Sequence, residues 1–176
     1  ADTDADTDAD TDADTDADTD AECIPCQGSF TIETWEDIAE YAQCESHCGD
    51  LLLGDQDWLP SFDQPCLTAV GRDVHISEND SLHTLDMPNL TTVGEDLALR
   101  DNPSLRTLDL SSLTTVRRLY IYENDALTTL AGLSSLTTIR STLYIYNNDA
   151  LCQSEAEAFA ARLGASVEHV WGNDDC

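Results

Sequence analysis

The sequence predicts a mainly β fold, a right-handed parallel β-helix (β-solenoid) of about five coils with a short α-helix capping each end. The first observation is a period of 23 residues, which separates leucines that open the same phrase: Leu67, Leu90, Leu113 and Leu136. A fixed period in this range indicates one supersecondary unit per repeat, and such units bury their apolar faces only by stacking. The second observation is strand-like alternation within each unit, with too few residues left for a crossover helix.

The repeats occupy most of the chain. We expect an acidic tetrapeptide tract over 1–21 and the β-solenoid over 22–176, with repeats at about 44–66, 67–89, 90–112, 113–135 and 136–152. In each repeat two apolar residues stand two positions apart, as Leu97 and Leu99 do, so both side chains point inward. Their counterparts are Val74 and Ile76, Leu119 and Ile121, and Leu143 and Ile145.

Both ends of the stack need covers. Thr34 and Asp37 outline a capping box, which predicts a helix running to about Gln43. A second helix is expected over 154–163, with Gly164 as its stop. One asparagine recurs at an equivalent turn position, and stacked asparagines can bond the backbone of adjacent coils. This predicted asparagine ladder consists of Asn79, Asn102, Asn124 and Asn148.

The first 20 residues are five copies of Ala-Asp-Thr-Asp. Because this tract lacks large apolar residues and repels itself, it favours a solvated, extended spacer. An alternative is a carrier of O-linked glycans on its threonines, Thr3, Thr7, Thr11, Thr15 and Thr19. A third interpretation is Ca²⁺ bound by the aspartates, although the glycine of calcium loops is missing. Outside the tract, Asn89 lies in a loop and starts an N-glycosylation sequon, whereas the sequon at Asn79 falls within the ladder.

Charge and cysteine content restrict the partners and the compartment. The chain has 36 acidic and seven basic residues, a net charge of -29, which argues against nucleic acid and anionic membranes. Seven cysteines in a small repeat domain favour disulfides over zinc, so we expect an extracellular or cell-surface protein. There is no signal peptide or apolar transmembrane run, and we interpret the sequence as a mature or trimmed product without direct membrane insertion.

The entry to the repeats resembles a known family. Cys26-Gln27-Gly28, a helix, Cys44 and Gly49-Asp50-Leu51 are similar to the start of a receptor L domain, the leucine-rich β-helical ligand-binding module of insulin and epidermal growth factor receptors. The repeat phrase is similar too, and bacterial surface proteins carry such modules. Arg117 and Arg118 depart from the pattern, because they stand where its Gly-x-Asp element is expected. The fold hosts many partners, so the resemblance implies little about the ligand.

The resemblance implies a disulfide between Cys26 and Cys44. Cys152 and Cys176 flank the second helix and are expected to bridge across it. Cys48 and Cys66 lie on neighbouring coils, which suggests a third bridge. Cys23 is then left over, to pair between chains or to replace Cys26 in the first bridge.

The outward positions of the repeats are the candidate binding surface. Coils stacked in register would gather four tyrosines beside several arginines, and this set is Tyr120, Tyr122, Tyr144, Tyr146, Arg100, Arg118 and Arg140. Aromatic faces and guanidinium groups suit sugar rings, carboxylates or an acidic peptide. The alternative is plain cross-strand stacking that stabilises the sheet.

The sequence therefore predicts a recognition or adhesion module that binds an extracellular protein or glycan. The rival hypothesis is a structural protein, a glycosylated spacer or a fibre, in which the solenoid is a cap. Self-association, with the basic patch of one chain holding the acidic tract of another, is a further hypothesis. An enzyme is not expected, because no nucleophile, base and acid converge in the repeat pattern. No cofactor or metal is expected apart from Ca²⁺ on the tract.

Overall fold

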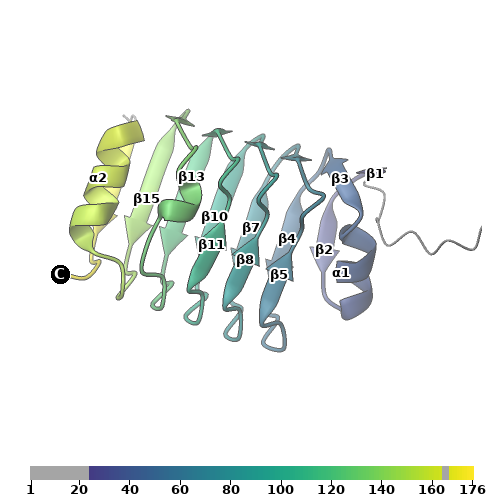
Figure 1. Cartoon of the computed structure of the whole chain (residues 1–176), viewed down its shortest axis with the longest axis horizontal. Helices are drawn as coiled ribbons and strands as arrows, with labels where there is room; N and C mark the ends of the chain where they lie inside the picture. The colour runs from purple at the N-terminus through teal and green to yellow at the C-terminus, as the bar shows by residue number, and fades with distance from the viewer. Residues whose placement is uncertain (1–23, 164–166) are drawn as a thin grey trace, which may run out of the picture.

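The computed structural model describes residues 24–163 and 167–176. In these residues the protein is mainly β, with three parallel sheets and a helix at each end of the row of strands (Figure 1). The mainly β prediction is confirmed. The expectations for the acidic tract and for Gly164 fall outside the described residues.

Each sheet takes strands from successive repeats. Sheet A contains β1 (Ile24–Cys26), β3 (Cys44–His47), β6 (Ala69–Val70), β9 (Thr92–Val93), β12 (Thr115–Val116) and β14 (Thr138–Ile139). Sheet B contains β2 (Phe30–Ile32), β4 (Leu51–Gly54), β7 (Val74–Ser77), β10 (Asp96–Arg100), β13 (Arg118–Tyr122), β15 (Thr142–Tyr146) and β16 (Val167–Trp171). Sheet C contains β5 (Ser61–Asp63), β8 (Thr84–Asp86) and β11 (Thr107–Asp109).

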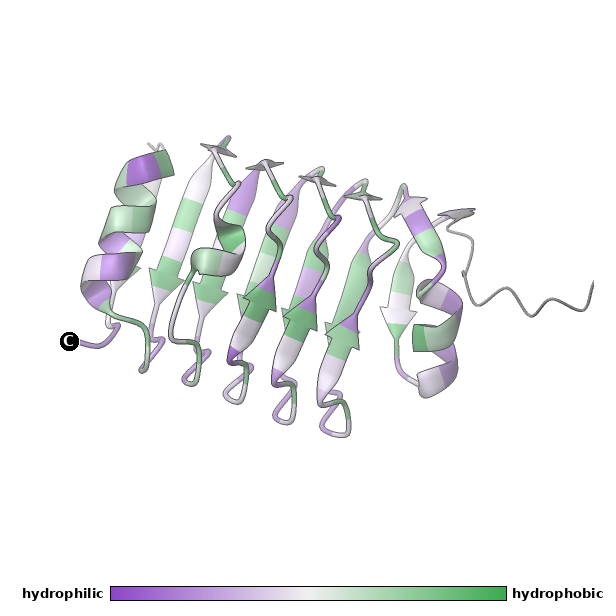
Figure 2. Cartoon of the chain, viewed as in Figure 1, coloured by the Kyte–Doolittle hydropathy of each residue, from purple (hydrophilic) through white to green (hydrophobic). Residues whose placement is uncertain are grey.

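The register of sheet B follows the sequence repeat. Leu97 lies opposite Val74 on one side and opposite Leu119 on the other, and Leu119 lies opposite Leu143. All four side chains are fully buried, as the alternation of apolar residues predicts. Figure 2 shows hydrophobic residues recurring at matching places in successive strands. The same alternation sends the residues between them to the outer face, where the candidate site lies.

Helices α1 (Trp35–Tyr41) and α2 (Gln153–Leu163) lie at opposite ends of the row of strands (Figure 1). The predicted capping box is confirmed, because Thr34 accepts a hydrogen bond from the Asp37 backbone and the Asp37 carboxylate accepts one from that of Thr34. Helix α1 ends two residues earlier than the sequence suggests. A short 3-10 helix, η1 (Ala131–Leu133), follows the third repeat phrase.

The asparagine ladder is confirmed, and it is longer than predicted. Each predicted member is fully buried, and its side-chain amide donates to backbone carbonyls of its own repeat and the preceding one. The same side-chain amide also donates to the Oδ1 atom of the asparagine in the next repeat, and the series ends at Asn173. At the other end the backbone N–H of Gln56 donates to Asn79. The series from Gln56 to Asn173 thus fixes the turns that follow the sheet B strands from β4 to β16.

Two of the three predicted disulfides are present, namely Cys26–Cys44 and Cys152–Cys176. The predicted Cys48–Cys66 bridge is wrong, because Cys48 is a free, exposed thiol, whereas Cys66 is disulfide-bonded. His47 is buried at the end of β3, so alternation turns the next side chain, Cys48, to solvent. Being on neighbouring repeats is not enough, because a disulfide also needs Cβ atoms directed toward each other. The expectation for Cys23 falls outside the described residues.

Sheet C carries a row of three aspartates in register, Asp63, Asp86 and Asp109. The Oδ1 atom of Asp86 is buried and has no hydrogen-bond partner among the described residues. Its burial raises the pKa of Asp86, and the neighbouring carboxylates Asp109 and Asp63 raise it further. The charged form of Asp86 is therefore unfavourable in the folded state.

We expect Asp86→Asn to stabilise the protein at neutral pH, by up to about 1 kcal/mol. Because the pKa of Asp86 is raised in the folded state, protonation of this carboxyl favours folding. That contribution is fully present below the ordinary carboxyl pKa, and it is lost as the pH rises through the pKa of the folded state. The gain should therefore shrink in acid, where Asp86 of the parent is protonated and as uncharged as the asparagine of the variant. Urea unfolding at neutral and acidic pH measures it; an equal gain at both would contradict this electrostatic cause.

Candidate functional site

The outer face of sheet B brings the four predicted tyrosines together at its C-terminal end. Parallel pairing places Tyr120 opposite Tyr144, and Tyr122 opposite Tyr146. The next strand, β16, adds His169 opposite Tyr144 and Trp171 opposite Tyr146. The face therefore carries two aromatic rows: the first is Tyr120, Tyr144 and His169, and the second is Tyr122, Tyr146 and Trp171.

Within each row the rings are nearly parallel and in contact. In the first row the ring centroids are 5.1 Å apart between Tyr120 and Tyr144, and 4.6 Å apart between Tyr144 and His169. In the second row the distances are 4.7 Å between Tyr122 and Tyr146, and 4.9 Å between Tyr146 and Trp171. No pair is tilted by more than 9°. The tyrosines in the middle of the rows thus have both ring faces covered by neighbours.

The open ring faces are at the ends of the rows. At the β16 end, Trp171 is 53% exposed and His169 is exposed. At the β10 end, Ala98 lies beside Tyr120, and Arg100 lies beside Tyr122. A ligand crossing the rows meets ring edges and phenol hydroxyls, and it meets a broad indole face at Trp171. Hydroxyl groups for hydrogen bonding next to an apolar face are a suitable surface for an uncharged sugar.

The predicted arginines lie close to the rows, but most are held by carboxylates. Nε of Arg118 is 2.7 Å from Asp96, and this hydrogen bond is the main cause of the raised pKa of Arg118. Arg117 is bonded to Glu95, and Arg100 lies 3.9 Å from Glu78. Arg140 is exposed and has no ion pair among the described residues. The arginines therefore do not form a free basic patch.

A one-residue deletion explains why two arginines stand here. Arg118 is in register with Asp96, and the Arg117 backbone donates to the Glu95 carbonyl. The residue missing from this repeat is thus the counterpart of Gly94, and the arginines replace an acidic pair. In the earlier repeats the carboxylates of Asp50 and Asp73 accept from the backbone of the next aspartate. Arg118 ends that row of aspartates with an opposite charge.

His169 and Trp171 are site residues that the sequence reasoning missed. They lie beyond the last copy of the repeat phrase, so the 23-residue period does not include them. The signal was the sequence His-Val-Trp, which places two aromatic residues two positions apart, as in Tyr120 and Tyr122. Such spacing after the α2 helix indicates one more strand with the same outward face.

The remaining candidate residues are separate from this face. Asn89 is exposed and its side chain donates to the Pro65 carbonyl at 2.8 Å. The tract threonines and the possible Ca²⁺ on the tract lie outside the described residues. Within the described part of the chain no cluster of three or more His, Cys, Asp or Glu side chains has the geometry to hold a metal ion. No helix described there is long and apolar enough to cross a membrane.

Comparison of the chain with protein-family models, with curated proteins and with solved structures finds no match in any of the three. The functional argument therefore rests on the geometry of the aromatic rows.

Proposed function

We propose that the protein is an extracellular or cell-surface recognition module that binds a glycan through the aromatic rows of sheet B. The observation that carries the proposal is the pair of stacked rows ending in the exposed indole of Trp171. Stacked tyrosines alone would stabilise the sheet. An indole more than half exposed at the end of a row, however, contributes little to the core and offers a flat apolar face to a ligand.

An uncharged sugar fits this face better than an acidic ligand does. The guanidinium groups of Arg117 and Arg118 are bonded to Glu95 and Asp96, so an incoming carboxylate would have to compete with them. For the same reason the proposal does not depend on the acidic tract of a second chain.

The scaffold we propose is a right-handed β-solenoid of the receptor L domain type. Its support is the register: a repeat contributes one strand to each of several parallel sheets, and strands of successive repeats are neighbours. On such a scaffold the outer residues can change without disturbing the inner ones. The disulfides Cys26–Cys44 and Cys152–Cys176 support an oxidising compartment.

We expect at least one neutral oligosaccharide to bind the protein. Quenching of tryptophan fluorescence and calorimetry would detect this binding. The Trp171→Ala variant and the double variant Tyr122→Ser, Tyr146→Ser should each weaken binding by about tenfold or more, since they remove the stacking face. Trp35→Ala is the matched control, because Trp35 is 59% exposed at the opposite end of the molecule.

Thermal unfolding should show that each variant still folds. No binding by any neutral oligosaccharide would contradict the proposal, and so would equal losses in Trp171→Ala and Trp35→Ala. If a protein bound in place of a sugar, and its binding depended on Trp171 in the same way, the assignment of the site would stand but the ligand would be a protein.

A further inference from the structure

A second exposed aromatic surface lies at the N-terminal end of the molecule. Trp35 is the first residue of α1 and is 59% exposed, and Trp58 follows β4 and is 37% exposed. Their ring centroids are 4.5 Å apart with planes inclined by 55°. Together with Trp171 they are the exposed large hydrophobic residues of the described chain. Neither tryptophan belongs to the buried core, so packing alone does not account for the pair.

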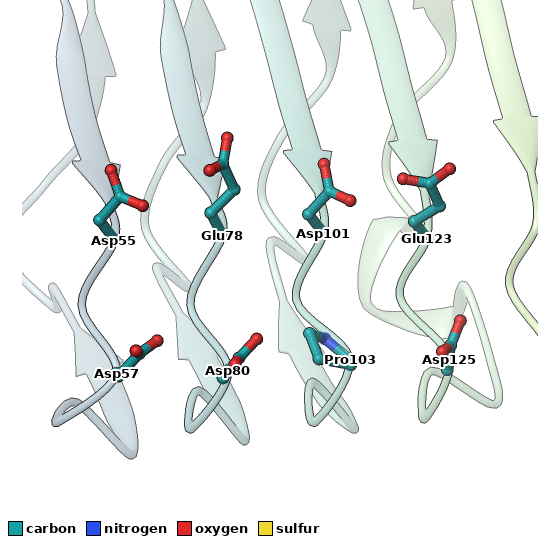
Figure 3. Close-up of a pocket in the computed structure, with 8 residues that line it drawn as sticks. All are labelled: Asp55, Asp57, Glu78, Asp80, Asp101, Pro103, Glu123 and Asp125. Carbon is teal, nitrogen blue, oxygen red and sulfur yellow. The ribbon is translucent and has the colours of Figure 1, made fainter.

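The described part of the molecule also has a long acidic groove. It has a volume of about 630 Å³ and contains two rows of side chains along the turns that follow sheet B (Figure 3). The upper row is Asp55, Glu78, Asp101 and Glu123, and the lower row is Asp57, Asp80, Pro103 and Asp125. Asp57 of the lower row immediately precedes Trp58, so the groove and the tryptophan pair are connected through adjacent residues of the chain.

The fold presents these carboxylates rigidly. Each residue of the upper row directly precedes a member of the buried turn series Gln56, Asn79, Asn102 and Asn124, whose hydrogen bonds fix the turns. Neighbouring strands in a sheet are about 4.8 Å apart, so the four upper carboxylates extend over about 14 Å. An extended segment of about five residues has the same length.

The groove has little internal compensation for its charge. Arg100, 3.9 Å from Glu78, makes the one ion pair to a groove carboxylate within the described residues. The pKa of Glu123 is raised, first by its hydrogen bond to Asp101 and then by partial burial. The pKa of Asp125 is raised by burial and by the charge of Asp149. Crowded carboxylates of this kind are stabilised by a cationic partner.

We propose that the Trp35–Trp58 pair and the acidic groove form a docking surface for a basic segment of another protein. An arginine or lysine side chain of that segment lies against the indole faces, and further basic side chains follow the carboxylate rows. The complementary charge selects this partner over a sugar. In addition, the indole N–H of Trp58 already donates to Gln56 at 2.7 Å, which leaves its ring face rather than its donor for a ligand.

The test is fluorescence anisotropy of a labelled peptide of alternating arginine and serine, added to the full chain at near-physiological salt. The groove variant is Glu78→Gln, Asp101→Asn, Glu123→Gln. The control variant removes the same charge from sheet C, as Asp63→Asn, Asp86→Asn, Asp109→Asn. We expect the groove variant to bind about tenfold more weakly, and the control to stay within about twofold of the parent.

The tryptophans are tested separately, because charge alone attracts any polycation to this chain. Trp35→Ala should weaken binding of the peptide by about threefold, and Trp35→Phe should weaken it less. Trp171→Ala should have no effect on peptide binding. Trp35 is exposed, so its variants should fold normally, which thermal unfolding verifies. Equal weakening by the groove and control variants would overturn the proposal, as would unchanged binding by Trp35→Ala or a neutral oligosaccharide bound at Trp35.

Discussion

Replacing Asn102 with alanine is expected to lower the free energy of unfolding by about 3 kcal/mol or more. The Asn102 side chain is fully buried and donates to the carbonyls of Ile76 and Arg100 at 3.0 and 2.8 Å. It also accepts from the backbone and the side chain of Asn79. Alanine cannot replace any of these bonds. The backbone N–H of Asn79 would be left buried without its partner, and an unpaired buried donor costs much more than a lost surface bond.

The matched control is Asn89→Ala, since Asn89 is exposed and bonds only the Pro65 carbonyl. Its loss should cost about 1 kcal/mol or less. Urea unfolding of both variants measures the difference. If Asn102→Ala were no more destabilising than Asn89→Ala, the ladder would be a by-product of the fold and not one of its main stabilising elements. The same measurement bears on the acidic groove, because the ladder fixes the turns that present its carboxylates.

The fold was predictable because its signals are local and repeated. The alternation at Leu97 and Leu99 recurs in each repeat, and each occurrence reports the same inward face. The ladder was predictable for the same reason, since an asparagine recurs at one turn position. The Cys48–Cys66 bridge was not predictable from the repeat. The period places the two residues on neighbouring repeats, but the direction of each side chain depends on local geometry.

The candidate site was predictable in part. The tyrosines could be placed together because the repeat gives their register. The neutralisation of Arg118 followed from the one-residue deletion, which moves it opposite Asp96, but the electrostatic consequence appears only when the pair is seen at 2.7 Å. Strand β16 has no copy of the repeat phrase, so Trp171 was missed. The groove was missed for another reason. The chain has 36 acidic residues, so no particular cluster of them stands out in the sequence.

Gly94→Ala is expected to destabilise the protein by about 2 kcal/mol or more, although the added group is one methyl. A Cβ atom at Gly94 would lie 2.0 Å from the carbonyl oxygen of Gly71 in the preceding repeat. That neighbour is backbone, so it cannot move aside as the end of a flexible side chain can. Gly49 and Gly71 show the same close approach, at 2.2 and 2.5 Å from the backbone of their preceding repeats. The glycines therefore allow the turns before the sheet B strands to stack closely.

Gly54→Ala is the matched control, because Gly54 is also in sheet B but its Cβ would lie 3.4 Å from the Ser77 carbonyl oxygen, an ordinary contact. We expect its unfolding midpoint to stay near that of the parent or to rise slightly, since alanine restricts the unfolded chain. A loss as large as that of Gly94→Ala would mean that any methyl on this sheet is harmful. A selective loss at Gly94 would instead identify the close turn as the cause.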